Sequence, residues 1–522
     1  MAEKSPDAVE VQPVRTPASD SRPPQLVSWC GRIAGPLLAL FVYSYLGSLD
    51  ALTPEATKTG AIATLMAIWW MTEAIPLPVT SMLPLVLFPL CGILDLSAAA
   101  PSYANKYIFL FMGGFMIARA VEKWNLHRRI ALLTVSLVGT QPSRLVAGFM
   151  LATAGLSMWI SNTASTVMML PIGLSLVTLL SEHLHQADQE SHGIRKSVGG
   201  AGENFATCMM LGIAYAASIG GLATLVGTPT NLFLAGFADE KHITIGFGRW
   251  MLFATPLALM LLAATWMLLT KAVFPIRVKQ LDGSRALIQT ELDKMGRVSR
   301  GEWIVLVVFG LTAFAWVVRE PVTNAQWLVE LLPAIAKVDD TVIALVGMIS
   351  LFLIPVDLHK GRAALDWETA VNIPWGVLLL FGGGFCLAEA VADSGLAEWI
   401  GTRVEVLDLS KIALMIAVVT LVVFLTELTS NTPTAATFLP ILYGVAQGMN
   451  VDPMLLLVPA TLAATCAFML PVATPPNAIV FGSGHIAIGS MVKAGLWLNL
   501  LSIALISLWM WLVGTRVFGM TQ

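Results

Sequence analysis

One polar triplet, present twice inside long apolar sequence, constrains this chain more than any other feature. Ser-Asn-Thr occurs at 161–163 within the apolar run 145–181, and again at 430–432 within the run 411–447. Hydroxyl and amide groups at membrane depth are costly unless protein, water or a ligand satisfies them. Two copies of one such triplet therefore suggest two halves of a single binding site.

Composition defines the class of protein. Of the 522 residues, 56% are hydrophobic and only 12% are charged, whereas soluble domains carry about 25% charged residues. The chain is therefore predicted to cross a membrane many times. A net charge of -3 and the lack of a basic tract argue against a nucleic-acid partner. The five cysteines lie singly and are interpreted as packing residues, not as a disulfide or metal framework.

Apolar runs of roughly twenty residues predict membrane helices. The uninterrupted runs are about 31–50, 60–77, 79–99, 106–122, 247–273, 302–319, 340–356, 374–392 and 490–515. Two more runs, 205–238 and 454–481, are interrupted by Gly-Thr-Pro-Thr-Asn at 227–231 and by Ala-Thr-Pro-Pro-Asn at 473–477. Proline removes a backbone donor and clashes with the preceding turn, so we expect both helices to open at these breaks.

The interruptions belong to an internal repeat. Residues 109–121 match residues 379–391 at eight of thirteen positions, and the triplets and the breaks then follow in the same order. An odd number of predicted crossings separates the two copies, so the copies should face opposite directions. Inverted repeats with broken helices are typical of secondary transporters. We predict an all-α integral membrane protein with eleven transmembrane helices and two re-entrant hairpins.

The predicted organisation has four parts, in chain order. They are a disordered cytoplasmic tail (1–28), a first half (29–273), a cytoplasmic connector (274–301) and a second half (302–522). Each half contains one hairpin, at 145–181 or 411–447, and one broken helix, at 205–238 or 454–481. Basic residues gather in the polar segments 119–144, 182–204 and 274–301. By the positive-inside rule, the side of the membrane that holds these segments is cytoplasmic. The N-terminus lies on the same side, and the C-terminus is predicted to lie outside.

The residue types indicate what the site binds. Hydroxyl, amide and carbonyl oxygens suit a hard monovalent cation such as sodium, and backbone N–H groups at helix starts suit a carboxylate or another oxyanion. Because each half supplies both kinds of group, the sequence predicts an anion bound between two cation sites. A single triplet could equally join neighbouring helices, but two copies in repeat register favour binding.

Intramembrane carboxyl groups are functional candidates by default. Glu73 lies just before Pro76 and is either functional or a helix cap at the interface. Glu427 lies three residues before the second triplet, where it could tune that site or pair with a cation. Arg119 and Glu389 hold matching repeat positions near helix ends, and we expect both to reach toward the membrane interface.

At these residues the sequence resembles the divalent anion/sodium symporter family, in its sodium-coupled dicarboxylate branch. The resemblance covers about residues 30–520. It rests on the Trp-Trp-Met-Thr-Glu-Ala-Ile-Pro-Leu-Pro-Val-Thr stretch at 69–80, on both triplets and on both breaks. It implies a homodimer in which each protomer has a scaffold domain and a mobile transport domain that works as an elevator. Segments 60–99 and 302–356 would form the scaffold, and the hairpins and broken helices would move as one body.

The resemblance also implies the roles of individual residues. A first sodium site would use Ser157, Asn162 and Gly227, and a second would use Thr426, Asn431 and Ala473, for two or more sodium ions per protomer. The substrate carboxylates would contact both triplets, that is Ser161, Asn162, Thr163, Ser430, Asn431 and Thr432. Three residues of the breaks, Thr228, Thr474 and Pro475, would line the site.

The expected function is sodium-coupled symport of C4-dicarboxylates (succinate, malate and fumarate). Two alternatives stay open: a sodium-independent dicarboxylate exchanger, and a citrate or sulfate carrier of the same family. The hydroxyls of Ser157 and Thr426 favour symport. The sequence has neither a nucleophile–base set nor a metal cluster at membrane depth, so an enzyme is not expected. It also has no Asn-X-Ser/Thr acceptor site, which favours a bacterial inner membrane.

Overall fold

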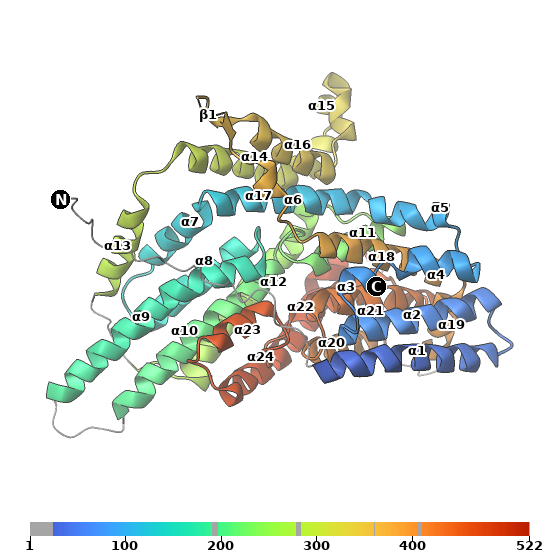
Figure 1. The fold of residues 1–522 in the computed structure, drawn as a ribbon, viewed down its shortest axis with the longest axis horizontal. Coiled ribbons are helices and arrows are strands. Elements are labelled where there is room, and N and C mark those ends of the chain that lie inside the picture. The colour runs from blue at the N-terminus through green and yellow to red at the C-terminus, as the bar shows by residue number, and fades with distance from the viewer. Residues whose placement is uncertain (1–24, 191–196, 278–282, 360, 406–409, 521–522) are drawn as a thin grey trace, which may run out of the picture.

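The computed structural model describes residues 25–190, 197–277, 283–359, 361–405 and 410–520 (Figure 1). Most of the predicted tail lies outside these residues. Its last part is helical, because α1 (Gln25–Gly47) begins six residues earlier than the predicted span. The described chain is almost wholly helical, which confirms the all-α prediction.

The first part of the chain departs from the predicted spans. After α2 (Pro54–Thr72) the chain forms α3 (Leu77–Thr80), α4 (Leu83–Cys91), α5 (Leu96–Ala99) and η1 (Ala100–Ala104). The prediction of one helix over 79–99 is therefore wrong. Prolines occupy the first turns of α3 and α4, where proline favours a helix start, and Gly92 ends α4 with a left-handed φ of 68°.

The internal repeat is visible in the order of the helices. The first copy comprises α6 (Lys106–Lys123), α7 (Leu126–Ser136), α8 (Pro142–Ser157), α9 (Asn162–Glu190), α10 (Ser197–Gly221) and α11 (Pro229–Glu240). The second copy comprises α18 (Trp375–Asp393), α19 (Leu396–Glu405), α20 (Lys411–Thr426), α21 (Asn431–Gly448), α22 (Met454–Thr465) and α23 (Pro475–Gly482). All four predicted interruptions occur where the triplets and the Thr-Pro breaks stand.

Three segments predicted as polar loops contain helix. Helix α7 lies within 119–144, α9 and α10 extend into 182–204, and α13 (Ser284–Met295) lies within the connector 274–301. These segments contain Leu, Glu, Gln, Lys and Arg, which are good helix formers. Their polarity indicates exposure to water, and it does not exclude helix.

The remaining elements connect and flank the two repeats. They are α12 (Phe247–Met267) with η2 (Leu268–Val273), α14 (Arg300–Thr323), α15 (Gln326–Leu331), η3 (Pro333–Lys337), α16 (Asp340–Leu353), β1 (Pro355–Asp357), β2 (Arg362–Ala363), α17 (Trp367–Ala370), α24 (Ile488–Trp509), η4 (Met510–Gly514) and α25 (Thr515–Val517). Strands β1 and β2 pair antiparallel in a short hairpin.

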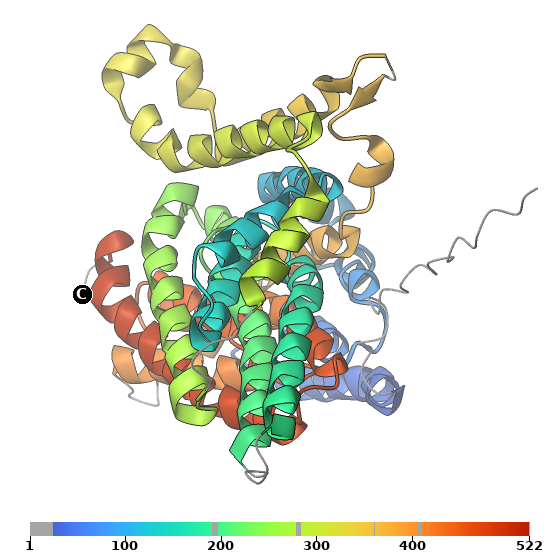
Figure 2. The same ribbon diagram turned by 90° about the vertical axis from the view of Figure 1, so that its left-hand side faces the viewer.

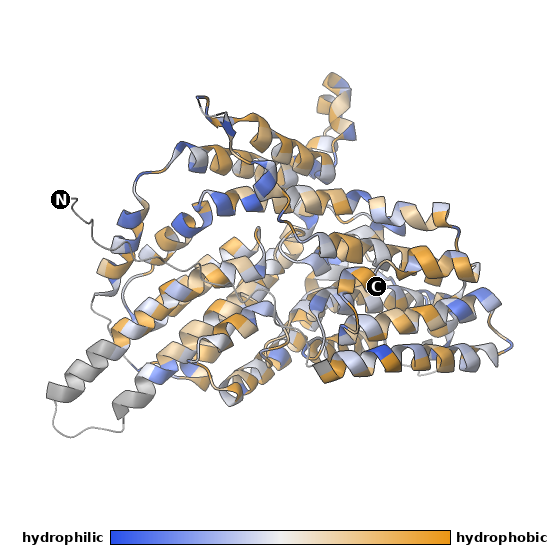
Figure 3. Ribbon diagram, viewed as in Figure 1, coloured by the Kyte–Doolittle hydropathy of each residue, from blue (hydrophilic) through white to orange (hydrophobic). Residues whose placement is uncertain are grey.

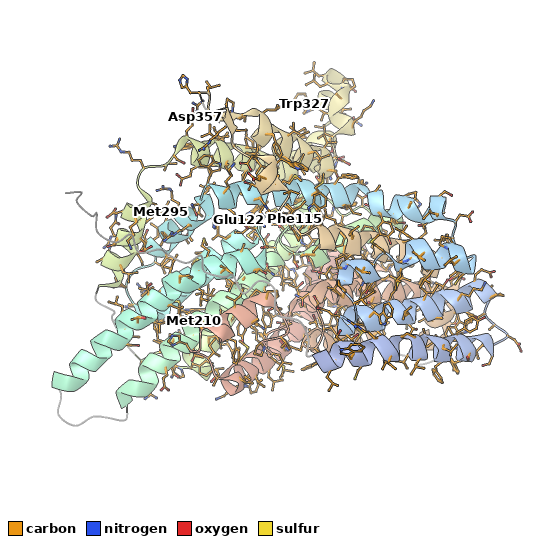
Figure 4. The ribbon with its side chains drawn as sticks, in the orientation of Figure 1. Phe115, Glu122, Met210, Met295, Trp327 and Asp357 are labelled. Carbon is orange, nitrogen blue, oxygen red and sulfur yellow. The ribbon has the colours of Figure 1, made fainter. Side chains whose placement is uncertain are left out.

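Helices α14, α15 and α16 form a layer at one edge of the molecule, beside α6 (Figures 1 and 2). Figure 4 shows Trp327 and Asp357 at opposite ends of this layer, with Phe115 and Glu122 on α6 beneath it. Leu311 and Phe314 are each 64% exposed on α14. Such an exposed apolar surface is typical of a lipid-facing or partner-facing region.

Apolar sequence covers most of the helices (Figure 3). Within the described residues, seven helices are long and apolar enough to cross a membrane: Leu26–Gly47, Asn162–Ser181, Gly202–Gly221, Phe247–Val273, Arg300–Thr323, Trp375–Asp393 and Ile488–Val517. Four shorter apolar helices accompany them. The count of eleven crossings stays a prediction.

Candidate functional site

The tips of the two hairpins carry the same hydroxyl–amide pair. In the first hairpin α8 ends at Ser157 and α9 begins at Asn162, and the Ser157 Oγ donates to Asn162 Oδ1 at 2.6 Å. In the second hairpin α20 ends at Thr426 and α21 begins at Asn431, and the Thr426 Oγ1 donates to Asn431 Oδ1 at 2.9 Å. Both hydroxyl side chains are fully buried. The structure therefore brings together two oxygens of each predicted cation site.

The two breaks are held open by matching asparagines. Asn231 Nδ2 donates to the carbonyl oxygens of Gly221, Leu222 and Thr224 at 2.8–3.2 Å. Asn477 Nδ2 donates to the carbonyls at the matching positions 467 and 470, both at 3.1 Å. These asparagines end the two break motifs, and sequence reasoning gave them no role. Their identical place in both motifs was the available signal.

Each hairpin tip contacts the break of its own half. In the second half, the Thr426 Oγ1 that faces Asn431 also lies 2.8 Å from the carbonyl oxygen of Ala464, one residue before α22 ends, so these two acceptors share one hydroxyl proton. In the first half, Thr224 Oγ1 donates to the carbonyl of Met158 at the hairpin tip. Hairpin and break thus form one unit in each repeat.

The two halves also contact each other. Thr230 Oγ1, in the first turn of α11, lies 2.8 Å from Thr465 Oγ1 at the end of α22. Thr228 Oγ1 lies 3.3 Å from Thr230 Oγ1 and extends this chain of hydroxyls. The repeats therefore meet at their breaks, as a site shared between two halves requires.

Eight helix ends gather around these contacts. Helices α8, α10, α20 and α22 end there, and their last carbonyls carry partial negative charge, which suits a cation. Helices α9, α11, α21 and α23 begin there, and their free N–H groups suit an anion. The oxygens are neutral and hard, as sodium needs. Within the described residues no group of three His, Cys, Asp or Glu side chains could hold a metal ion.

The predicted substrate residues differ in exposure. Ser161 and Pro475 are exposed, and four triplet residues are half-buried: Asn162, Thr163, Ser430 and Asn431. Thr228, Thr432 and Thr474 are buried. The triplets therefore present both accessible and enclosed polar groups. The contact of the Ala473 carbonyl with the second hydroxyl–amide pair stays a prediction.

Glu427 binds the backbone of the second break. Its carboxylate accepts hydrogen bonds from the N–H groups of residues 468, 469 and 470 at 2.6–3.1 Å and from Asn499 Nδ2 at 2.7 Å. Tyr215 donates to the Phe468 carbonyl at 2.8 Å in the same segment. The matching residue of the first repeat is Met158, so this anchor exists in one half only. The arrangement favours the hypothesis that Glu427 tunes the second site.

The other ionisable candidates lie away from the triplets. Glu73 is the C-cap of α2, with a left-handed φ of 45°, which favours the helix-cap interpretation. Arg119 pairs with Glu122 at 2.6 Å, and Glu389 accepts from Ser102 Oγ at 3.2 Å. Arg119 also lines a hollow of about 590 Å³ that contains no triplet residue.

A second polar cluster joins the end of α11 to the start of α6. Asn105 Nδ2 donates to Glu240 Oε1 at 3.0 Å, and Lys106 pairs with Asp239 at 2.9 Å. Burial raises the pKa of Glu240 to about 7, and the negative charges of Glu389 and Asp239 add to the rise. The Asn105 bond and the nearby Lys241 act in the opposite direction.

This raised pKa predicts a pH-dependent stability. The folded protein binds more protons at Glu240 than the unfolded chain between pH 4.5 and about 7, so it loses stability as the pH rises through that window. Glu240→Gln should therefore unfold at a higher temperature than the parent at pH 8, and the gain should vanish near pH 5. Thermal unfolding in detergent measures this, with the exposed Glu330→Gln as control. An equal difference at both pH values would contradict the assignment.

Comparison with known proteins identifies a family and several similar proteins. A family model described as the sodium:sulfate symporter transmembrane region matches residues 28–519. A protein of Staphylococcus saprophyticus, named sodium-dependent dicarboxylate transporter SdcS, is 41% identical over 496 residues, covering 94% of this chain and 92% of the relative. Its namesake from Staphylococcus aureus is 42% identical over 492 residues, with the same coverage.

Two solved structures are similar in fold. MtrF of Neisseria gonorrhoeae, described among antimetabolite efflux pumps, has a TM-score of 0.55 at 14% identity and covers 86% of this chain and 98% of its own. The YdaH transporter of Alcanivorax borkumensis has a TM-score of 0.51 at 13% identity and covers 94% and 98%. At these identities the likeness shows the fold alone.

Proposed function

Because the chain belongs to the sodium:sulfate symporter family, also called the divalent anion/sodium symporters, we propose that it couples sodium to the transport of C4-dicarboxylates. Succinate, malate and fumarate are the proposed substrates. The relatives named SdcS are sodium-dependent dicarboxylate transporters, and 41% identity over almost the whole chain supports the same chemistry here.

One observation carries the proposal: the hydroxyl–amide pair that recurs in both repeats, Ser157 with Asn162 and Thr426 with Asn431. Each pair lies where one helix ends and another begins, so a cation and an anion can both be stabilised beside it. We assign the first sodium ion to the first pair with Gly227, and the second to the second pair with Ala473. The substrate carboxylates contact the two triplets.

The proposed mechanism is an elevator. The hairpins 145–181 and 411–447 and the broken helices 205–238 and 454–481 move together against a fixed remainder. Moving these elements together keeps each hydroxyl–amide pair intact while its exposure changes, which supports this motion. The contacts across the boundary include buried hydrogen bonds, such as that from Asn499 Nδ2 to Glu427 at 2.7 Å, and stacked aromatic rings. Trp159 at the first hairpin tip stacks with Trp316 on α14 at a ring separation of 6.4 Å.

We further propose a homodimer in a bacterial inner membrane, with the N-terminus in the cytoplasm. The segments 60–99 and 302–356 form the scaffold that carries the dimer contact. The exposed apolar side chains of α14 and α16 support a partner-facing or lipid-facing surface there, as Leu353, for example, is 74% exposed.

Sodium dependence tests the assignment of the cation sites. Ser157→Ala or Thr426→Ala removes one oxygen ligand, so the sodium concentration for half-maximal succinate uptake should rise about tenfold, which corresponds to about 1.4 kcal/mol. Ser175→Ala is the matched control, because its hydroxyl bonds only to the Pro171 carbonyl of its own helix. An unchanged sodium dependence in both site variants would reject the assignment.

Two alternatives are separated by the same assay. A dicarboxylate exchanger takes up succinate without sodium when the vesicle contains a dicarboxylate. A citrate or sulfate carrier is recognised by competition. Excess unlabelled citrate or sulfate then inhibits the uptake of labelled succinate more strongly than excess malate does. The proposal predicts the opposite order.

A further inference from the structure

The two cation sites are related by the repeat, and one difference between their surroundings lies where the first helix of each pair gives way to the break. Gly221 is the last residue of α10, directly before the first break. The matching residue before the second break is Ala467. Both carbonyls accept a hydrogen bond from the asparagine that holds the break, Asn231 in one half and Asn477 in the other. The carbonyl thus has the same role at both positions, although Gly221 is the last residue of α10 and Ala467 lies two residues beyond the end of α22.

Glycine at 221 leaves space that two predicted ligands occupy. A Cβ atom placed on Gly221 would lie 2.8 Å from Asn162 Oδ1, 3.3 Å from Asn162 Nδ2 and 3.1 Å from the Gly227 carbonyl oxygen. Carbon and oxygen atoms in contact normally lie about 3.5 Å or more apart. A methyl group there would have to displace the Asn162 amide, the Gly227 carbonyl, or both.

Backbone conformation does not explain this glycine. The left-handed glycines of the described chain include Gly92 and Gly283 but not Gly221. Ala467 lies two residues beyond the end of α22, and its carbonyl accepts the matching asparagine bond although the residue has a Cβ atom. The structural reason that remains is the contact with Asn162 and Gly227.

We propose that Gly221 is a positioning residue for the first sodium site, because its missing side chain lets the Asn162 amide and the Gly227 carbonyl approach the same cation. The inference rests on the proposed function and goes beyond it, since Gly221 supplies no ligand itself. It also makes the two sites unequal: the first depends on a glycine where the second contains an alanine.

The test is sodium and lithium titration of succinate uptake by purified protein in vesicles. Gly221→Ala should raise the half-saturating sodium concentration about tenfold or more, within the range that an added methyl group causes in a packed site. It should also change the ratio of sodium to lithium half-saturation, which a general loss of folded protein would leave unaltered.

Two controls isolate the effect. Gly212→Ala crowds the same helix, but its nearest neighbours are the flexible side-chain atoms of Met150 at 3.1 and 3.3 Å, so sodium half-saturation should stay unchanged. Ala467→Gly opens the matching position of the second repeat and should change sodium half-saturation by less than twofold. An equal effect of Gly221→Ala and Gly212→Ala would overturn the inference.

A second variant covers a failure to fold. If Gly221→Ala does not reach the membrane, the double variant Gly221→Ala with Asn162→Ser should restore its level, because the shorter side chain relieves the contact. Continued absence would place the clash elsewhere and overturn the inference. Parent protein that takes up succinate without sodium would instead reject the proposed function, whereas a sodium-dependent parent with an unaffected Gly221→Ala variant would reject only the role of Gly221.

Discussion

Replacing Asn162 or Asn431 with aspartate should abolish dicarboxylate uptake while leaving the fold intact. The new carboxylate can still accept the hydrogen bond from Ser157 or Thr426, so the hairpin tip keeps its bond. It places a negative charge beside the substrate carboxylate, however. Two such charges about 4 Å apart repel by roughly 4 kcal/mol at an effective dielectric constant of about 20, which is close to a thousandfold.

Uptake of labelled succinate at saturating sodium measures this loss, and gel filtration in detergent checks the fold. The same chemical change at an exposed position, Asn324→Asp, serves as the control and should transport at the parent rate. Uptake at the parent rate by Asn162→Asp or Asn431→Asp would refute a site in which these amides contact the substrate.

Linking α6 to α11 should stop transport almost completely. Lys106 on α6 belongs to the proposed fixed remainder, and Asp239 directly follows the moving segment 205–238 on the same helix, α11, yet the two pair at 2.9 Å. Cysteines at both positions, joined by a short thiol-reactive linker, would hold the two bodies together. The unlinked double variant should transport normally, because an exposed ion pair contributes little stability.

The exposed Cys30 and the partly exposed Cys91 are replaced by serine in this background, because the remaining three cysteines are buried and the linker then meets the introduced pair. Cysteines at Lys123 and Asp366 form the matched control, since these residues pair at 2.6 Å and both lie in the proposed fixed remainder. Their linkage should leave uptake unchanged. Full uptake by the linked 106–239 pair would contradict rigid-body movement and favour local gating.

The candidate site could be proposed from the sequence because its parts are motifs that occur twice. The triplets, the hydroxyls before them and the breaks stand in repeat register, and the structure pairs Ser157 with Asn162 and Thr426 with Asn431. A residue that acts in one half only has no such signal. The contacts of Glu427 with residues 468–470 and with Asn499 join segments 41–72 positions apart, and no local pattern predicts them.

The fold shows the same division. Hydropathy predicted the long spans and their order, but a hydropathy average carries no information on where proline starts a helix. The single helix expected over 79–99 is therefore three short helices in the structure. It also treats polar sequence as loop, although α7 and α13 are helices of mixed polarity. The number of crossings, the direction of the repeats and the dimer depend on the membrane and on a partner chain, which neither hydropathy nor one chain specifies.

Sodium-driven accumulation is the most direct test of the central claim. Purified protein in proteoliposomes is given labelled succinate with an inward sodium gradient, and parallel vesicles receive an equal inward potassium gradient. Succinate should accumulate above its external concentration with sodium and should not accumulate with potassium. Equal uptake under both gradients, or uptake that requires only a dicarboxylate inside the vesicle, would contradict it.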